Sequence, residues 1–348
     1  MVDLSKFDVN AVANRNNNIF GLPFSEEDAK VVLLPVPWEV TVSCNAGTAR
    51  APEHIFKAST QIDLFDANMP QGWKKGFFMR DLDRKILMKS DYLRKEAELY
   101  IDFIAHGQDI NSNKFMQKGL KEINEGGIML NEWVYAQTKD LLSRDKLVGL
   151  IGGDHSVSLG YFKALAEKHE SFGILQIDAH CDLRSAYEKF NHSHASVMYN
   201  ALTEINEIEK LVQVGVRDYC EAEWNYICNS NFKVITYFDQ QIKERLFNGD
   251  HWVNIADEII SHLPEYVYFS FDIDGLDPKL CPHTGTPVPG GFQSDEVLYL
   301  LRKIVQSGKK LIGFDIVEVG TGENNYDAVV ASRLLWKICN LFVKSNCA

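Results

Sequence analysis

Apolar residues occur in short continuous runs along the chain, and longer amphipathic stretches separate these runs. The runs are continuous rather than alternating, which is typical of strands buried on both faces of a parallel sheet. They occupy residues 31–36, 147–151, 173–177, 211–216, 233–238, 266–271 and 310–317. Helical patterns lie between them at residues 157–168, 255–262 and 295–307, the last with Ser294 as its expected N-cap. This alternation predicts an α/β fold with helices on both faces of a mostly parallel sheet.

The interval from about residue 73 to residue 145 has a different pattern. It is rich in Lys, Glu, Leu and Tyr at helical spacing, and it is too long for a simple crossover between strands. We expect extra helices here, packed on one edge of the sheet, with a break at Gly126 and Gly127. No Pro-, Gly- or Ser-rich linker, charge run or internal repeat divides the chain, so residues 1–348 are expected to form a single domain.

The composition narrows the functional classes. With 45% hydrophobic and 24% charged residues, the 348-residue chain is typical of a soluble globular protein. A net charge of −12 argues against nucleic-acid binding, which needs a basic surface. No stretch approaches the ~18 consecutive apolar residues of a membrane span, and the polar, Asn-rich start of the chain lacks a secretory signal. Seven scattered cysteines are typical of reduced thiols, so we expect a cytoplasmic protein.

Metal-ligand side chains follow three of the apolar runs. The first motif is Gly-Gly-Asp-His at residues 152–155, the second is Asp-Ala-His-Cys-Asp at 178–182, and the third is Phe-Asp-Ile-Asp-Gly-Leu-Asp-Pro at 271–278. Because open α/β sheets place ligands at the carboxyl ends of their strands, the three motifs are expected to converge on one site. The candidate metal ligands are His155, Asp178, His180, Asp182, Asp272 and Asp274.

The spacing of these residues supports a shared site. Asp178, His180 and Asp182 alternate along an extended chain, so their side chains can face one cavity, and Asp272 and Asp274 repeat the arrangement. Any one of them alone is more simply a hydrogen-bonded histidine or a turn-forming aspartate. Carboxylate oxygens with some imidazole suit manganese or a similar divalent ion, and six ligands suit two ions. The motifs therefore predict a binuclear metallohydrolase, in which two ions generate hydroxide at neutral pH.

These motifs resemble the three signatures of the ureohydrolases, the family of arginase, agmatinase and their relatives. The resemblance extends over residues 152–156, 178–184 and 270–278, and it continues through residues 284–291 and 313–319. It implies a three-layer α/β/α fold and hydrolysis of a small cationic guanidino substrate to urea and an amine. The usual cofactor is two Mn²⁺ ions per chain, although the same ligands accept Ni²⁺ or Co²⁺. The resemblance also implies a homo-oligomer, commonly a trimer or hexamer.

The resemblance further implies a ligand set for each ion. One ion would be held by His155, Asp178, Asp182 and Asp272. The other would be held by His180, Asp178, Asp272 and Asp274, so that Asp178 and Asp272 bridge the two.

Three catalytic residues are implied in the same way. Glu318 matches the glutamate that binds the guanidinium group, for which a carboxylate is a bidentate acceptor. His194 matches the mobile histidine that protonates the departing amine, because imidazole titrates near neutral pH. His192 is its rival, two residues away, and Asp182 is a further candidate for passing the proton to the leaving nitrogen.

The loops around the site favour the agmatinase-type branch of the family. Residues 184–190 resemble that branch and lack the side chains that recognise the α-carboxylate and α-amine of arginine. Residues 44–52 and 320–325 depart from the common pattern, which leaves arginine, guanidinobutyrate and small guanidines as alternatives. Formiminoglutamate hydrolysis is another alternative, whereas a non-catalytic relative is expected to lose metal ligands. Trp38 and Tyr187 are candidates for lining the mouth of the pocket.

Overall fold

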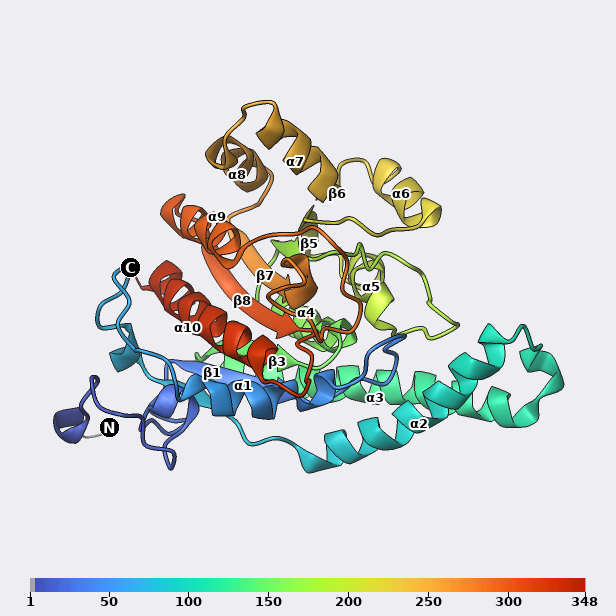
Figure 1. Ribbon diagram of the computed structural model, residues 1–348, viewed down its shortest axis with the longest axis horizontal. Coiled ribbons are helices and arrows are strands. Elements are labelled where there is room, and N and C mark those ends of the chain that lie inside the picture. The colour runs from blue at the N-terminus through green and yellow to red at the C-terminus, as the bar shows by residue number, and fades with distance from the viewer. Residues whose placement is uncertain (1–3, 348) are drawn as a thin grey trace.

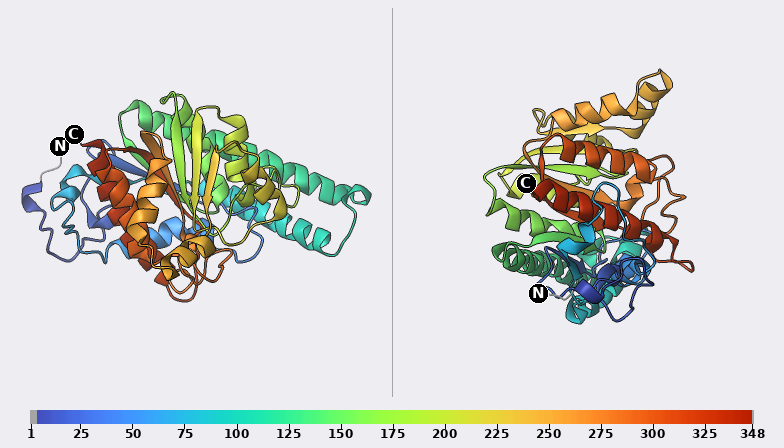
Figure 2. Two further views of the ribbon diagram at one scale, coloured as in Figure 1. Left: turned by 90° about the horizontal axis from the view of Figure 1, so that it is seen from above. Right: turned by 90° about the vertical axis from the view of Figure 1, so that its left-hand side faces the viewer.

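The computed structural model describes residues 4–347, and this part of the chain is built around one eight-stranded sheet (Figure 1, Figure 2). All strand pairs are parallel, in the order β2-β1-β3-β8-β7-β4-β5-β6. The strands are β1 (Val31–Val36), β2 (Phe77–Met79), β3 (Leu147–Gly152), β4 (Phe172–Ile177), β5 (Ile208–Val214), β6 (Val234–Tyr237), β7 (Tyr266–Asp272) and β8 (Lys310–Val317). The predicted α/β class is confirmed, with a sheet that is entirely parallel.

Helices cover both faces of the sheet. Within residues 4–347 the α-helices are α1 (Ala51–Ser59), α2 (Arg84–Ala105), α3 (Lys114–Ser143), α4 (Leu159–Ala166), α5 (Val197–Glu204), α6 (Glu221–Cys228), α7 (Asp239–Phe247), α8 (Trp252–Ser261), α9 (Ser294–Gln306) and α10 (Tyr326–Asn346). Helices α1, α8, α9 and α10 contribute to the hydrophobic cluster on one face, and α2, α3, α4 and α5 contribute to the cluster on the other. The result is the three-layer α/β/α arrangement that the resemblance implied. No helix in the described part of the chain has the length and apolar run needed to cross a bilayer.

The central strands are apolar along their whole length because both of their faces are covered. Consecutive residues enter opposite clusters: Leu150 and Tyr268 pack on the side of α2–α5, whereas Ile151 and Phe269 pack on the side of α8–α10. Polar side chains are therefore concentrated where the strands end, and this is where the sequence motifs lie.

The interval between residues 73 and 145 holds β2, α2 and α3. The sequence did not predict β2, because three residues at an edge of the sheet are too few to form a recognisable apolar run. Helices α2 and α3 lie side by side as a hairpin whose far end projects from the body of the molecule (Figure 1). The base of α3 packs against α4 and the neighbouring strands, which anchors the hairpin.

The break expected at Gly126 and Gly127 is wrong, because α3 continues without interruption through both residues. Their small size serves close packing instead. A Cβ atom on Gly126 would collide with Leu93 Cδ1 of α2, and one on Gly127 would lie 2.8 Å from His192 Cβ. These glycines allow neighbouring segments to approach α3 and do not allow the chain to turn.

The start of α9 also differs from the prediction. The helix begins at Ser294 rather than after it, and its N-cap is Gln293. The backbone N–H of Gln293 donates to Glu296 Oε2 at 2.7 Å, which is one half of a capping box. The predicted boundary was one residue late because serine is the commoner N-cap residue.

Candidate metal centre

The predicted metal ligands lie at the carboxyl ends of neighbouring strands. Strand β3 leads into His155, β4 leads into Asp178, and β7 ends at Asp272. With β8, these strands are adjacent in the order β3-β8-β7-β4, so their carboxyl ends lie at one edge of the sheet. Parallel pairing thus brings together three separate motifs, of which the first and the third are more than a hundred residues apart in the sequence.

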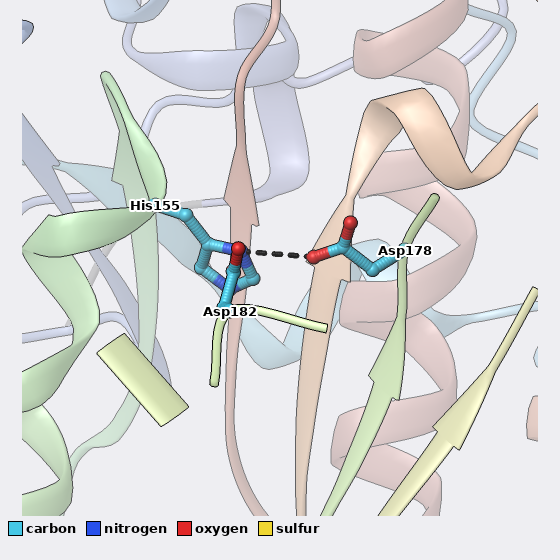
Figure 3. Close-up of side chains that lie close together, drawn as sticks. All are labelled: His155, Asp178 and Asp182. Carbon is cyan, nitrogen blue, oxygen red and sulfur yellow. Dashed lines mark ion pairs between the residues drawn. The ribbon is translucent and has the colours of Figure 1, made fainter. Parts of the chain in front are cut away.

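The first ligand group consists of His155, Asp178 and Asp182, and all three side chains are buried. The Nδ1 atom of His155 lies 3.1 Å from Asp178 Oδ2 and 2.8 Å from Asp182 Oδ2. Figure 3 shows the imidazole and the two carboxylates close together, with the His155–Asp178 ion pair dashed. Asp272 Oδ2 lies 3.4 Å from the same nitrogen, so a third carboxylate borders the group.

The second ligand group consists of Asp178, His180 and Asp274. The Nδ1 atom of His180 lies 3.0 Å from Asp274 Oδ2 and 3.5 Å from Asp178 Oδ1. Asp178 therefore belongs to both groups, with Oδ2 facing one histidine and Oδ1 facing the other. The structure brings all six predicted ligands into one cluster, in two groups that share a carboxylate.

The residues of this cluster fit divalent metal ions. His155 Nδ1 and Asp274 Oδ2 are buried without a hydrogen-bond partner in the described part of the chain. Burial raises the pKa of Asp182 to about 7, and repulsion from Asp178 adds to the shift. Burial also raises the pKa of Asp272 well above its ordinary value, together with repulsion from Asp274 and Asp178. A cation would offset this repulsion, and a donor set of carboxylate oxygens and imidazole nitrogens suits Mn²⁺ and similar ions.

A hydrogen-bond chain behind His155 fixes the orientation of its ring. The Oγ–H group of Ser270 donates to Asp315 Oδ2 at 2.9 Å, and Ser270 Oγ lies 2.9 Å from His155 Nε2. Because the serine proton is directed at Asp315, Ser270 Oγ accepts the Nε2–H proton of His155. The lone pair of the neutral imidazole then lies on Nδ1, which faces the carboxylates.

A second chain of polar side chains supports Asp178 from three successive strands. Gln176 Nε2 donates to Asp178 Oδ2 at 2.7 Å, and Gln213 Nε2 donates to Gln176 Oε1 at 2.7 Å. Thr236 Oγ1 donates to Gln213 Oε1 at 2.9 Å. The sequence analysis did not select these residues. A glutamine inside the apolar run of β4 was nevertheless a signal, because a buried polar side chain needs a hydrogen-bond partner.

Two residues of the site have strained backbones. Asp182 has a φ of 56° and Glu318 has a φ of 57°. Both values lie in the left-handed region, which residues other than glycine rarely adopt. Local hydrogen bonds hold both: the Met198 and Tyr199 amides donate to Asp182 O at 3.2 and 3.1 Å, and Thr284 Oγ1 donates to Glu318 O at 2.7 Å. The strained backbone at Asp182 and Glu318 costs stability, and it places their two carboxylates in the site.

Glu318 follows β8 and is buried beside the first ligand group. Its Oε1 atom accepts the backbone N–H of His155 at 2.9 Å. Its Oε2 atom lies 3.0 Å from the position that a Cβ atom would take on Gly285, so only glycine leaves this oxygen free space. Burial raises the pKa of Glu318 well above its ordinary value, and repulsion from Asp154 adds to the shift.

A cavity of about 130 Å³ opens next to the ligand groups. Its lining residues are Ser43, His180, Asp182, Arg184, Tyr187, His194, Ala195, Asp218, Tyr219, Glu223 and Thr286. Tyr187 is thus placed where the sequence suggested, and its ring is edge-on to His194 at 6.0 Å. Trp38 does not line the cavity. It is 1% exposed and packs in the core with α2 and α3, so the prediction that it lies at the pocket mouth is wrong.

The two candidate shuttle histidines lie in different places. His194 lines the cavity with His180 and Asp182. Burial lowers the pKa of His194 to about 3, and repulsion from His180 adds to the shift. His192 packs against α3 instead, where its Nδ1 atom lies 3.2 Å from Asn131 Nδ2, and it lines a separate pocket with Lys163.

Known proteins share both the sequence pattern and the fold. The sequence pattern of the arginase family matches residues 29–340. The chain is 28% identical to N(1)-aminopropylagmatine ureohydrolase of Thermus thermophilus over 320 residues, which are 90% of this chain and 91% of the relative. It is 30% identical to agmatinase of Proteus mirabilis over 306 residues, which are 88% of this chain and 84% of the relative.

A solved structure supports the same relationship. The fold matches the crystal structure of agmatine ureohydrolase of Thermoplasma volcanium with a TM-score of 0.70 and 21% identity, over 94% of each chain. This likeness shows a common architecture, and the family pattern covers most of the chain. The chain therefore belongs to the arginase family and is a hydrolase.

Proposed function

We propose that the chain is an agmatinase-like ureohydrolase, which uses two divalent metal ions to hydrolyse a guanidino compound to urea and an amine. The observation that carries this proposal is Asp178, whose two carboxylate oxygens face the histidines of two ligand groups beside one cavity. A carboxylate shared in this way suits a site for two ions that lie close together. The relatives named agmatinase and N(1)-aminopropylagmatine ureohydrolase support the same reaction.

Each ion would take four ligands from this chain. We assign His155, Asp178, Asp182 and Asp272 to the first ion, and His180, Asp178, Asp272 and Asp274 to the second. When bound, the ions would supply hydroxide at neutral pH and stabilise developing negative charge. Mn²⁺ is the first candidate because most of the donors are carboxylate oxygens, and Ni²⁺ or Co²⁺ would accept the same set.

Glu318 would bind the guanidinium group. Its Oε1 atom is held by the His155 amide, which leaves Oε2 beside Gly285, the residue that precedes Thr286 of the cavity lining. A carboxylate accepts the paired N–H groups of a guanidinium, and the bound cation would stabilise the ionised form of a buried glutamate.

His194 would protonate the departing amine. It is the histidine that shares the cavity with His180 and Asp182, so its imidazole lies where it could carry a proton to the departing nitrogen. Asp182, which contacts His155 of the first ligand group and also lines the cavity, would pass a proton toward the same nitrogen.

The cavity favours a short substrate that is positively charged at both ends. Its volume of about 130 Å³ suits a guanidino group on a linear chain. The Asp218 carboxylate lies exposed at its rim, where it would attract a second cation. The positive charge of Arg184 is partly offset by Glu223 at 3.7 Å, and its guanidinium lies over the Tyr187 ring. These features favour agmatine over guanidinobutyrate, whose far end is an anion.

The test is urea release by the Mn²⁺-loaded protein. We expect urea from agmatine or N(1)-aminopropylagmatine in preference to arginine, guanidinobutyrate or guanidine. Asp178→Asn should bind less metal and release no urea. His194→Ala should lose roughly 10²- to 10⁴-fold in kcat, whereas the matched His192→Ala should keep its activity. Two bound ions per chain without urea from any of these compounds would contradict the proposal.

A further inference from the structure

Three charged residues of the cavity lining have no part in the proposed metal centre or proton transfer. They are Arg184, Asp218 and Glu223. The guanidino end of a substrate would face the metal centre, so these three charges remain to meet its other end, called the far end below. One of them is a cation and two are anions, and their arrangement therefore bears on which charge the far end can carry.

Arg184 is a cation with unused hydrogen-bond donors. Its guanidinium group makes no hydrogen bond among residues 4–347, and its side chain is 36% exposed. Its Cζ atom lies 4.9 Å from the centroid of the Tyr187 ring, which also lines the cavity. A planar guanidinium with free N–H groups suits a carboxylate. Arg184 by itself would therefore favour a substrate with an anionic far end.

Glu223 holds the opposite charge in a fixed position. It is 3% exposed, and its two carboxylate oxygens accept backbone N–H groups from two segments. Leu183 N–H donates to Oε1 at 3.1 Å, and Cys220 N–H donates to Oε2 at 3.0 Å. These bonds keep the carboxylate beside Arg184, whose Nε atom lies 3.7 Å from Oε2.

We propose that the Arg184–Glu223 ion pair determines which charge the cavity accepts at the far end of a substrate, an inference that rests on the proposed function. Glu223 offsets the charge of Arg184, and Asp218 then leaves this part of the lining with a net negative charge. The cavity therefore selects a cationic far end. Without Glu223, Arg184 would be free to bind a carboxylate at the same place.

Glu223 also has a structural role, and the two roles predict different results. Its carboxylate belongs to the capping box at the start of α6. Loss of this cap would weaken the binding of all substrates together. Loss of its charge would instead change the preference between a cationic and an anionic far end, so the ratio of two substrates separates the roles.

The test compares agmatine, whose far end is a cation, with guanidinobutyrate, whose far end is an anion. The measured quantity is the ratio of kcat/KM for urea release by the Mn²⁺-loaded protein, agmatine over guanidinobutyrate. Glu223→Gln should lower this ratio about tenfold, and Arg184→Gln should raise it about tenfold, because each change removes one charge near the far end. The double variant Glu223→Gln/Arg184→Gln should return to nearly the native ratio, since Asp218 again supplies the net charge.

Glu221→Gln is the matched control. Glu221 lies in the first turn of the same helix, but it is exposed and does not line the cavity. The substitution removes the same charge as Glu223→Gln and should leave the ratio unchanged, because solvent screens an exposed charge. Circular dichroism of each variant checks that the fold is retained, and Arg184→Gln alone decides if Glu223→Gln does not fold.

Binding of two unreactive amines separates this inference from the proposed reaction. Diaminobutane and aminobutyrate are the amines that agmatine and guanidinobutyrate would release, and neither has a guanidino group to hydrolyse. Calorimetry with the Mn²⁺-loaded protein gives the ratio of their affinities, which should change in the variants as the ratio of kcat/KM does. If the native protein releases no urea, the proposed function fails, and the affinity ratio still decides the role of the ion pair.

Two results would overturn the inference. One is an unchanged ratio in Arg184→Gln, which would show that its charge does not act on the far end. The other is a shift in the same direction in Arg184→Gln and Glu223→Gln, which would show that the two charges do not oppose each other.

Discussion

At the scale of the residue, Thr41 occupies a position between Asp154 and His194. Its Oγ1 atom accepts the backbone N–H of His194 at 3.1 Å, and it lies 3.3 Å from His194 Nδ1 and 3.5 Å from Asp154 Oδ2. The single hydroxyl proton has two acceptors within reach, so its direction decides which ring nitrogen of His194 carries a proton. Thr41 is therefore a positioning residue for the proposed proton donor.

Thr41→Val should reduce kcat about tenfold, since one hydrogen bond to the shuttle histidine is worth roughly 1–2 kcal/mol. KM and metal content should stay unchanged, because Thr41 touches neither the metal ligands nor the expected path of the substrate. Thr41→Ser keeps the hydroxyl and should restore kcat. The pH dependence of kcat separates the two variants, and a Thr41→Val enzyme with native kcat at every pH would refute the role.

The cluster of six candidate metal ligands could be predicted because its sequence signal is local. Alternating His and Asp residues after an apolar run indicate a ligand set within five residues of sequence. Ser270, Asp315 and Thr41 could not be predicted in this way, because each acts through a contact with a residue on another strand or loop. The sequence contained one signal for two of them: Ser270 and Asp315 are polar residues within strands whose neighbouring positions are apolar.

At the scale of the element, helices α3 and α4 are in close contact at Gly160. A Cβ atom on Gly160 would collide with the backbone O of Asn131 and lie 2.9 Å from the backbone N of Tyr135. Backbone atoms within a helix cannot move aside as a flexible side chain can. Gly119, on the same α3, offers a comparison, because a Cβ atom there would meet only Glu96 Oε2 at 3.7 Å.

Gly160→Ala should lower the free energy of unfolding by about 1–3 kcal/mol or more, because the two helices must separate. Gly119→Ala should raise it by up to about 1 kcal/mol, because alanine favours the helix. Urea denaturation of both variants measures the two changes. Equal effects of the same sign would show that the glycine contact between α3 and α4 is not tight.

A charge cluster links the loop before β1 to both β2 and α3. Arg80, just after β2, donates from Nε to Glu26 Oε2 at 2.8 Å, and Arg144, at the end of α3, lies 2.5 Å from Glu26 Oε1. The hydrogen bond from Arg80 outweighs burial and lowers the pKa of Glu26 from 4.5 to about 2. Three segments that are distant in sequence are therefore held by one carboxylate.

Glu26→Gln should reduce the free energy of unfolding at neutral pH by roughly 1 kcal/mol, a modest value because solvent screens these partly exposed groups. The pKa of Glu26 is lower in the folded state, so its stabilisation is complete above pH 4.5 and is lost as the pH falls toward 2. The native and Glu26→Gln proteins should therefore converge in acid. Denaturation curves across this range measure the difference, and a constant difference would contradict the expectation.

Most of the sheet and the covering helices could be predicted from hydrophobic pattern alone, because buried strands require continuous apolar runs. The exceptions have physical causes. Strand β2 has too few residues to form a pattern, and the glycine pair in α3 serves close packing that only the neighbouring segments reveal. Glycine in a sequence indicates either a turn or a close approach, and the pattern on its own does not distinguish them.

At the scale of the whole molecule, the candidate metal centre joins three strands, β3, β4 and β7, and its buried carboxylates repel one another. Removing metal with a chelator should therefore lower the melting temperature, and adding Mn²⁺ should restore it. Binding at about 100 times the Kd stabilises the folded state by roughly 3 kcal/mol. Calorimetry with and without metal measures this shift. Asp274→Asn should diminish the shift, and identical melting with and without metal would contradict a metal-binding role for the cluster.

The overall architecture could be predicted once the motifs were placed at strand ends, because parallel strands share one carboxyl edge. The direction in which the α2–α3 hairpin projects could not be predicted. Helical periodicity in residues 84–143 predicts helices with one buried face, but it contains no information on how far they extend beyond the sheet.

The projecting α2–α3 hairpin also determines how the molecule moves through a liquid. The chain has its long axis along this arm (Figure 1), and a body with an arm meets more friction than a sphere of the same mass. It should diffuse and sediment more slowly than a compact protein of 39.5 kDa. A gel-filtration column calibrated with compact standards would then overestimate its size, whether the chain is alone or paired. Comparing the elution volume with a mass from sedimentation equilibrium, which does not depend on shape, would separate the length of the arm from the number of copies.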